Sequence, residues 1–207
     1  ARSHLADRYG LVRTEAAKTI TALAEEPEKE WKAILASATH GHTIARAILA
    51  LAKLNPASIA DEVHEMADHE DKFVRMAVAQ GLVAVGGERQ LGLLRALAGD
   101  PEISVRTAVT RACPKLEDGE EAVRLMAGLL FDDAQSVRRS AIVNLADIAA
   151  DGVAPLFVKV LKREPAAPLR REAAQLVRKA KDAPSVLKEL EALAKQEKEE
   201  RVRKSLE

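Results

Sequence analysis

Apolar residues recur along this chain with the spacing of amphipathic helices, and one arrangement returns at nearly constant intervals. Valine or leucine followed by arginine opens an apolar stretch in "HEDKFVRMAV", "DPEISVRTAV", "DDAQSVRRSA", "EPAAPLRREA" and "EKEERVRKSL". With two related segments near the N-terminus, the aligned arginines are Arg13, Arg46, Arg75, Arg106, Arg138, Arg170 and Arg203. They lie 33, 29, 31, 32, 32 and 33 positions apart. This spacing predicts a tandem repeat of about 32 residues.

A second apolar segment separates successive arginines, and glycine or proline lies at or near its start. These segments are "PEKEWKAILA", "PASIADEVHEMA", "GERQLGLLRALA", "GEEAVRLMAGLL", "GVAPLFVKVLK" and "APSVLKELEALA". Each repeat is therefore predicted to contain two helices of about twelve residues. Because a pair of short amphipathic helices cannot bury both apolar faces alone, the repeats must stack on one another. The prediction is an all-α solenoid of about six helix pairs.

Helical geometry separates three faces on each arginine-bearing helix. At 100° per residue, the positions four, eight and eleven after the valine fall within 80° of it and form the core stripe. Two examples of this stripe are Val74, Val78, Leu82 and Val85, and Val137, Ala141, Leu145 and Ile148. The arginine lies at 100°, on the flank of the stripe, where its stem covers apolar surface and its guanidinium reaches a neighbouring turn. We therefore expect a structural role for these arginines.

An acidic or turn residue stands six places before the arginine, and proline follows it at Pro101 and Pro165. With the valine–arginine pair, this pattern resembles the HEAT family, in particular the short repeats of phycobilisome-lyase-like proteins, over nearly the whole chain. The resemblance implies a right-handed α-α superhelix in which acids and arginines form a ladder between repeats. The ladder residues would be Arg75, Arg106, Arg138, Arg170, Asp100, Asp132 and Glu164. His40 and His69 occupy the acid's place in the early repeats.

Positions two, six and nine after the valine lie opposite the core, on a face that the resemblance makes concave. In the first repeat they are Thr14, Lys18 and Thr21, and basic residues gather in the later repeats. The candidate partner-binding residues are Arg111, Arg139, Arg171, Gln175, Arg178, Met76 and Gln80. Rigid guanidinium groups suit carboxylates and phosphates, so an acidic peptide is the expected ligand. The alternative is an ordinary solvated helix face.

Composition narrows the class of protein. Hydrophobic residues make up 47% of the chain, which is enough for a real core, and aromatic residues only 2%, which favours close helix packing. Lys plus Arg equals Asp plus Glu at 32 each, so no net field draws the molecule to nucleic acid or an anionic membrane. No signal peptide or membrane-spanning stretch is recognisable, and we expect a cytoplasmic protein. We expect one domain over residues 1–207, as a fragment of a longer protein.

Single residues refine this picture. Cys113 stands alone and lies on the core stripe, which favours packing over nucleophilic chemistry. Pro114 should end its helix early, and Trp31 is expected to pack against the preceding repeat. His40, His42 and His69, with Asp68 nearby, are a candidate metal cluster, although their spacing favours turn and cap roles. We therefore predict no metal.

No phosphate-binding glycine loop or catalytic constellation is recognisable in the sequence. We therefore predict a protein-binding scaffold without enzymatic activity or cofactor. The alternatives are a lyase-like subunit or regulatory module of an enzyme, and a protein that binds the nucleic-acid backbone. The terminal repeats offer apolar surface through which a second copy of the chain could pair.

Overall fold

The computed structural model describes residues 1–206, which contain 13 α-helices and no β-strand. The α-helices are α1 (Gly10–Leu23), α2 (Pro27–Ser37), α3 (Gly41–Leu54), α4 (Ala60–Glu65), α5 (Lys72–Val85), α6 (Glu88–Leu97), α7 (Ile103–Ala112), α8 (Gly119–Leu129), α9 (Gln135–Leu145), α10 (Val153–Arg163), α11 (Ala167–Leu176), α12 (Leu187–Gln196) and α13 (Glu200–Leu206). Short 3₁₀ helices are η1 (Arg2–Ala6), η2 (Pro56–Ile59), η3 (Cys113–Lys115), η4 (Val177–Lys179) and η5 (Ala183–Val186).

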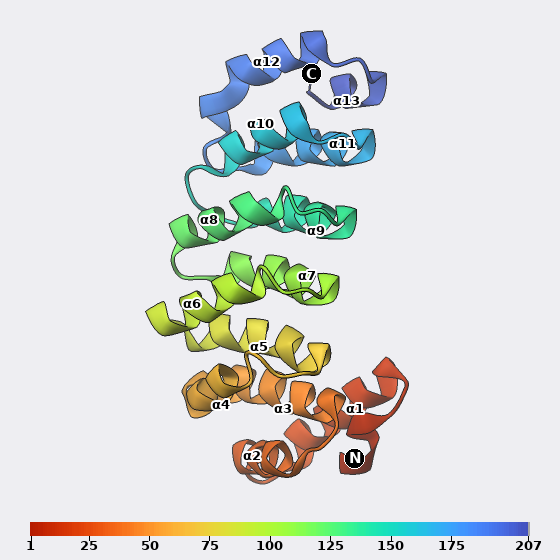
Figure 1. Ribbon diagram of the computed structural model, residues 1–207, viewed down its shortest axis with the longest axis vertical. Helices are drawn as coiled ribbons and strands as arrows, with labels where there is room; N and C mark the ends of the chain where they lie inside the picture. Colours follow the sequence, from red (N-terminus) through yellow and green to blue (C-terminus); the bar gives the residue numbers. More distant parts are fainter. Residues whose placement is uncertain (207) are drawn as a thin grey trace. The chain divides into compact units, whose positions relative to one another are not determined.

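The chain divides into two compact units, Ala1–Val109 and Thr110–Glu207, with the division inside α7. Within each unit the helices follow one another as stacked pairs (Figure 1). The even-numbered helices from α2 to α12 are the first helices of their pairs. The second helices are α3, α5, α7, α9, α11 and α13, and α1 is of the same kind. Second helices of neighbouring pairs pack together, as α3 does with α5 in unit 1 and α11 with α9 and α13 in unit 2.

The predicted core stripe is buried. In α9, Val137, Ala141 and Leu145 are fully buried. In α5, Val74, Val78 and Leu82 are buried as well, whereas Val85 is only half-buried because the helix ends there. Alternation of this stripe with exposed polar positions lets each short helix bury one face against its neighbours, which stabilises it beyond its intrinsic propensity.

Acidic side chains fix several helix starts. The carboxylate of Asp71 accepts from the backbone N–H of Phe73 at 2.7 Å and caps α5, and Asp118 caps α8 in the same way. Asp182 acts across a repeat, since its two oxygens accept from the backbone N–H groups of Gly152 and Ala154 at the start of α10. These bonds satisfy donors that the helix itself leaves unpaired.

Two expectations about single residues hold. Trp31 is fully buried, and its indole N–H donates to the hydroxyl of Thr21 on α1 at 3.0 Å. It therefore packs against the preceding repeat. The α-helical part of α7 ends at Ala112, and the 3₁₀ turn η3 follows with Pro114 at its second residue. The missing N–H and the ring of this proline prevent the helix from continuing.

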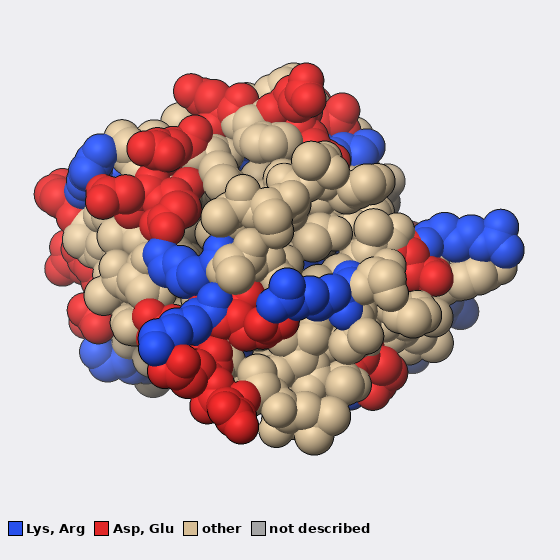
Figure 2. Space-filling model, turned by 90° about the horizontal axis from the view of Figure 1, so that it is seen from below, with Lys and Arg blue, Asp and Glu red and all other residues tan. Residues whose placement is uncertain are grey.

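The N-terminal end of unit 1 carries apolar side chains in solvent. Leu11 and Leu23 of α1 are 82% and 79% exposed. Charged side chains of both signs surround uncharged surface in the end view (Figure 2). None of the helices within residues 1–206 combines the length and apolar composition that a membrane crossing requires.

Cys113 provides a test of the core. Its side chain is fully buried, and burial raises the pKa of the thiol to about 12. Because the thiolate is the reactive species, the folded protein should react with a thiol reagent such as DTNB far more slowly than the protein unfolded in urea. Rapid stoichiometric labelling of the folded protein at neutral pH would contradict this burial.

Candidate functional site

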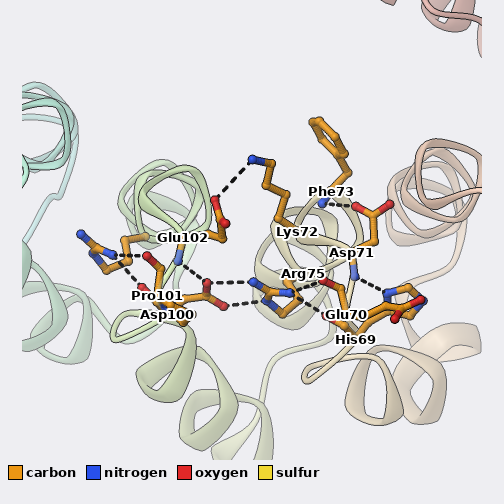
Figure 3. Close-up of polar contacts among 10 residues, drawn as sticks. His69, Glu70, Asp71, Lys72, Phe73, Arg75, Asp100, Pro101 and Glu102 are labelled. Atoms are coloured by element: carbon orange, nitrogen blue, oxygen red, sulfur yellow. Dashed lines mark hydrogen bonds and ion pairs between the residues drawn. The ribbon is translucent and has the colours of Figure 1, made fainter.

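The repeated arginine joins two successive turns, and Arg75 shows the geometry in full (Figure 3). Its Nη1 donates to the backbone oxygens of His69 and Glu70, in the turn that precedes its own helix, at 2.7 and 2.9 Å. Its Nε and Nη2 donate to the two carboxylate oxygens of Asp100, in the next turn, at 2.7 and 3.0 Å. One planar guanidinium thus fastens consecutive repeats with charge-assisted, bidentate bonds.

Unit 2 repeats this arrangement twice. Arg138 bonds the carboxylate of Glu164 at 2.7 and 3.2 Å and the backbone oxygen of Asp132 at 3.0 Å. Arg170 bonds the carboxylate of Glu197 at 3.0 and 3.1 Å and the backbone oxygen of Glu164 at 3.0 Å. Glu164 therefore serves two arginines, Arg138 through its carboxylate and Arg170 through its backbone oxygen.

Arg106 and Asp132 also make the local bonds of this geometry. Arg106 donates to the backbone oxygens of Asp100 and Pro101 at 2.7 and 3.2 Å. The carboxylate of Asp132 accepts from the backbone N–H of Ala134 at 2.8 Å. The same bond to the N–H two residues on is made by Asp100 and by Glu164.

The ladder carboxylates are held in their charged form. Burial by itself would raise the pKa of Asp100 and Glu164, but bonds from Arg75 and Arg138 and from backbone N–H groups outweigh it, so both pKa values lie below their ordinary range. The pKa of Glu197 is lowered chiefly by its bond from Arg170. Because the pairs are mostly shielded from solvent, their charges stay coupled more strongly than those of surface pairs.

The early repeats vary the motif. Arg13 donates to the backbone oxygens of Asp7 and Arg8, so the local half of the geometry is present. His69 replaces the acid in the turn before α5, where its Nδ1 accepts from the backbone N–H of Asp71 at 3.0 Å. The imidazole thus takes over the bond that Asp100 or Glu164 makes in later turns.

Arg46 does not fit the predicted alignment. The core stripe of α3 runs through Ile44, Ile48 and Leu51, so Arg46 lies two residues after the first core position instead of one. Its Nη2 donates to the hydroxyl of Thr14 on α1 at 3.1 Å. The alignment of Arg46 with the ladder arginines is therefore wrong, because the helix buries isoleucines in a register that carries the arginine one position further round.

The candidate histidine cluster is not assembled as a metal site within the described residues. His42 stacks on Phe73 with ring centroids 4.1 Å apart, and His69 is engaged with Asp71. The Nδ1 of His40 lies 3.2 Å from the hydroxyl of Thr39. Within the part of the chain that the structure describes, no three His, Cys, Asp or Glu side chains are placed to hold a metal ion.

The candidate binding residues lie on the side of the second helices that faces away from the core stripe, here called the open face. Arg111, Arg139, Arg171 and Gln175 are exposed on α7, α9 and α11 of unit 2. In unit 1, Gln80 is exposed and Met76 half-buried on α5. The seventh candidate, Arg178, is exposed in η4.

These arginines are not equally available to a ligand. Arg139 is paired with Glu172 of α11 at 3.2 Å, and Arg178 donates to the backbone oxygen of Leu206 at 2.6 Å. For Arg111 and Arg171 the structure records no ion pair within residues 1–206. A carboxylate from a partner would therefore meet Arg111 and Arg171 without displacing an internal acid.

Sequence reasoning missed that the open face of unit 1 is also basic. Arg46 and Lys53 on α3 lie two and nine residues after the core residue Ile44. Thr14 and Thr21 occupy the equivalent positions on α1. The signal was present in "TIARAILALAKL", whose isoleucines and leucines at i, i+4 and i+7 mark the core stripe better than the arginine does.

Comparison with known proteins identifies the repeat. Residues 28–114 match the model of a protein family described as HEAT repeats. No curated protein matches the chain. The match confirms the predicted resemblance to HEAT repeats over residues 28–114.

Two solved structures resemble the whole fold. One is an engineered protein, 17% identical with a TM-score of 0.52, where the match covers 87% of this chain and 94% of that chain. The other is the complex of CpcE and CpcF of phycocyanin lyase from Nostoc sp. PCC7120, 19% identical with a TM-score of 0.51, where the match covers 99% of this chain and 90% of that chain. At these identities the likeness shows the fold alone, and it agrees with the predicted all-α solenoid class.

Removal of a ladder carboxylate should destabilise the protein. We expect Glu164→Gln to lower the free energy of unfolding by about 1.5–3 kcal/mol, because it weakens two charge-assisted bonds and removes the carboxylate paired with Arg138. The exposed pair of Lys162 and Glu189 is the control, and Glu189→Gln should cost less than about 1 kcal/mol. Urea unfolding followed by circular dichroism measures both. Equal costs for the two variants would refute the special role of the ladder.

Stability should depend on pH through the same carboxylates. Asp100, Glu164 and Glu197 have pKa values below those of the unfolded chain, so they bind protons more weakly when folded. Their contribution is complete above the unfolded value of about 4 and is lost as pH falls through the lower folded values. The free energy of unfolding of the wild type should therefore decline steeply below about pH 4. Asp100→Asn/Glu164→Gln/Glu197→Gln should decline less, and parallel curves would contradict this.

Proposed function

We propose that the HEAT repeats of this chain form a protein-binding scaffold whose open face recognises an acidic segment of a partner. One observation carries the proposal. Three arginines of unit 2 are exposed on this face: Arg111 at the end of α7, Arg139 on α9 and Arg171 on α11. Guanidinium groups held on helices are preorganised to receive carboxylates, and less of their freedom is lost on binding.

The difference between the ladder arginines and the open-face arginines supports the scaffold proposal. The ladder arginines Arg75, Arg138 and Arg170 are mostly buried, and their N–H groups donate to internal carboxylates. The open-face arginines lie next to them in sequence at Arg139 and Arg171, yet they point to solvent. Each "RR" pair thus combines one arginine that stabilises the fold with one that is exposed to a ligand.

Neighbouring residues define which contacts remain for the partner. Gln175 of α11 offers both a donor and an acceptor near Arg171. Glu172 lies beside Arg139 and partly neutralises it, so Arg139 contributes less than the two arginines without a recorded ion pair in residues 1–206. Met76 and Gln80 would supply a less charged contact on α5 of unit 1.

The alternative is that the chain is a subunit or regulatory module of an enzyme. Its fold resembles that of a complex named for phycocyanin lyase, which is the observation that keeps this alternative in view. The two proposals differ in what the purified protein should carry. A stoichiometric protein partner supports the scaffold, and a bound pigment or a processed small molecule supports the enzyme module.

Charge reversal tests the scaffold. We expect Arg111→Glu/Arg171→Glu to weaken capture of the partner retained by the wild type by about tenfold or more, since two favourable pairs become repulsive. Lys159→Glu/Lys188→Glu, on exposed positions of the first helices α10 and α12, is the matched control and should bind normally. Quantitative pull-down followed by calorimetry with the retained partner measures the change. Unchanged affinity of the arginine double variant would refute the proposal.

A further inference from the structure

An open groove runs between α1 and α3 on the open face of unit 1. Its volume is about 370 Å³, and Lys18, Arg46 and Lys53 line it together with apolar side chains that include Ala17, Leu49 and Leu54. The hydroxyls of Thr14 and Thr21 complete the lining, and both are already bonded, to Arg46 and to the indole of Trp31. The groove lining therefore combines apolar side chains, here called the floor, with basic side chains.

The positive charge of the groove is only partly compensated. Lys18 is paired with Glu15 at 2.8 Å on the solvent side, where both side chains are about two-thirds exposed. For Arg46 and Lys53, no ion pair is recorded within residues 1–206, and no Asp or Glu is among the lining residues. The guanidinium of Arg46 is half-buried beside a hydroxyl, which cannot balance its charge.

The surroundings of Arg46 make its charged form less favourable than it is in open solvent. Burial, and secondarily the guanidinium of Arg13, lower the pKa of Arg46 from its ordinary value. A carboxylate delivered by a ligand would offset both effects. The partly desolvated setting also makes such a pair stronger than one in open solvent.

The apolar floor indicates what carries the carboxylates. Leu54 is 41% exposed, and a purely anionic ligand would leave it and its neighbours in water. The groove lining has no aromatic side chain on which a nucleobase could stack. A segment with both leucine-like and acidic side chains covers the floor and meets the cations at once.

The spacing of Arg46 and Lys53 favours a ligand segment that is helical. Arg46 and Lys53 are seven residues apart on α3, or about 10.5 Å along its axis. Two glutamates seven residues apart on a second helix have the same separation, and apolar residues three and four places after the first glutamate lie between them on the same face.

We infer that the groove between α1 and α3 binds an amphipathic acidic helix of a partner protein. The apolar side chains of that helix seat on Leu49 and Leu54, and its carboxylates pair with Arg46 and Lys53. The inference rests on the proposed scaffold function, and it assigns to unit 1 a binding site that shares no residue with the arginines of unit 2.

A designed peptide probes the groove directly. The probe is a fluorescein-labelled helical peptide with glutamate at i and i+7 and leucine at i+3 and i+4, and binding is followed by fluorescence anisotropy. We expect saturable binding that weakens as NaCl is raised. Matched peptides with glutamine or lysine in place of both glutamates should bind about tenfold more weakly or worse.

Variants of the protein locate the binding. Lys53→Gln, at an exposed position, and Arg46→Gln should each weaken binding of the glutamate peptide, and the double variant by about tenfold or more. Leu54→Ser should weaken the binding of all three peptides. Lys29→Gln on α2, at a site 76% exposed and outside the groove, is the control and should leave binding unchanged. Circular dichroism melting curves verify that each variant is folded.

Several outcomes would overturn the inference. The glutamate peptide could show no saturable binding, or the lysine or glutamine peptide could bind equally well. The folded Lys53→Gln and Arg46→Gln variants could bind the glutamate peptide with unchanged affinity. A single-stranded oligonucleotide could compete for the groove as tightly as the glutamate peptide binds. The proposed function is tested separately, because Arg111→Glu/Arg171→Glu should bind the glutamate peptide normally. If only the groove variants lose binding of the glutamate peptide, the inference is supported. This holds even if Arg111 and Arg171 prove irrelevant to any partner.

Discussion

The guanidinium that spans two turns is the interaction on which this fold depends. Helix pairs of about twelve residues per helix have small contact areas, and apolar packing alone leaves freedom for one repeat to slide on the next. The planar fork of Arg75, Arg138 or Arg170 limits that freedom, because its bonds to a backbone oxygen and to a carboxylate are directional. Angle and spacing between neighbouring repeats follow from this constraint within each unit.

The same constraint leaves one side of each second helix exposed, and this is the side for which we propose a binding role. On each second helix the core stripe takes one face and the ladder arginine its flank, and the side chains opposite the core make fewer internal bonds. Arg170 bonds the carboxylate of Glu197 and the backbone oxygen of Glu164, whereas Arg171 and Gln175 are exposed and have fewer bonds to lose on substitution. A scaffold needs this separation, since partners can be exchanged by surface substitutions while the backbone that presents them stays rigid.

Arg46 shows how one residue can leave the first role for the second. In α3 the isoleucines set the register, and the arginine moves from the flank to the open face, where it bonds Thr14. The local result is a cation for which no ion pair is seen within residues 1–206, beside leucines that solvent reaches. The departure of this repeat from its pattern thus coincides with the groove that we propose as a binding site, and departures of this kind are often found at functional sites.

Much of this protein could be predicted from its sequence. The period of the valine–arginine pairs and the apolar stripes defined the helices, the core positions Val74 and Leu145, the burial of Cys113 and the packing of Trp31, because each depends on local periodicity. Tertiary structure alone decided which groups meet: that Arg139 is paired with Glu172, that the Nδ1 of His69 accepts from the backbone N–H of Asp71, and that Lys53 and Arg46 share a groove with α1. Those facts depend on how neighbouring helices are rotated and offset, and sequence spacing within one helix carries no information about its orientation against the next.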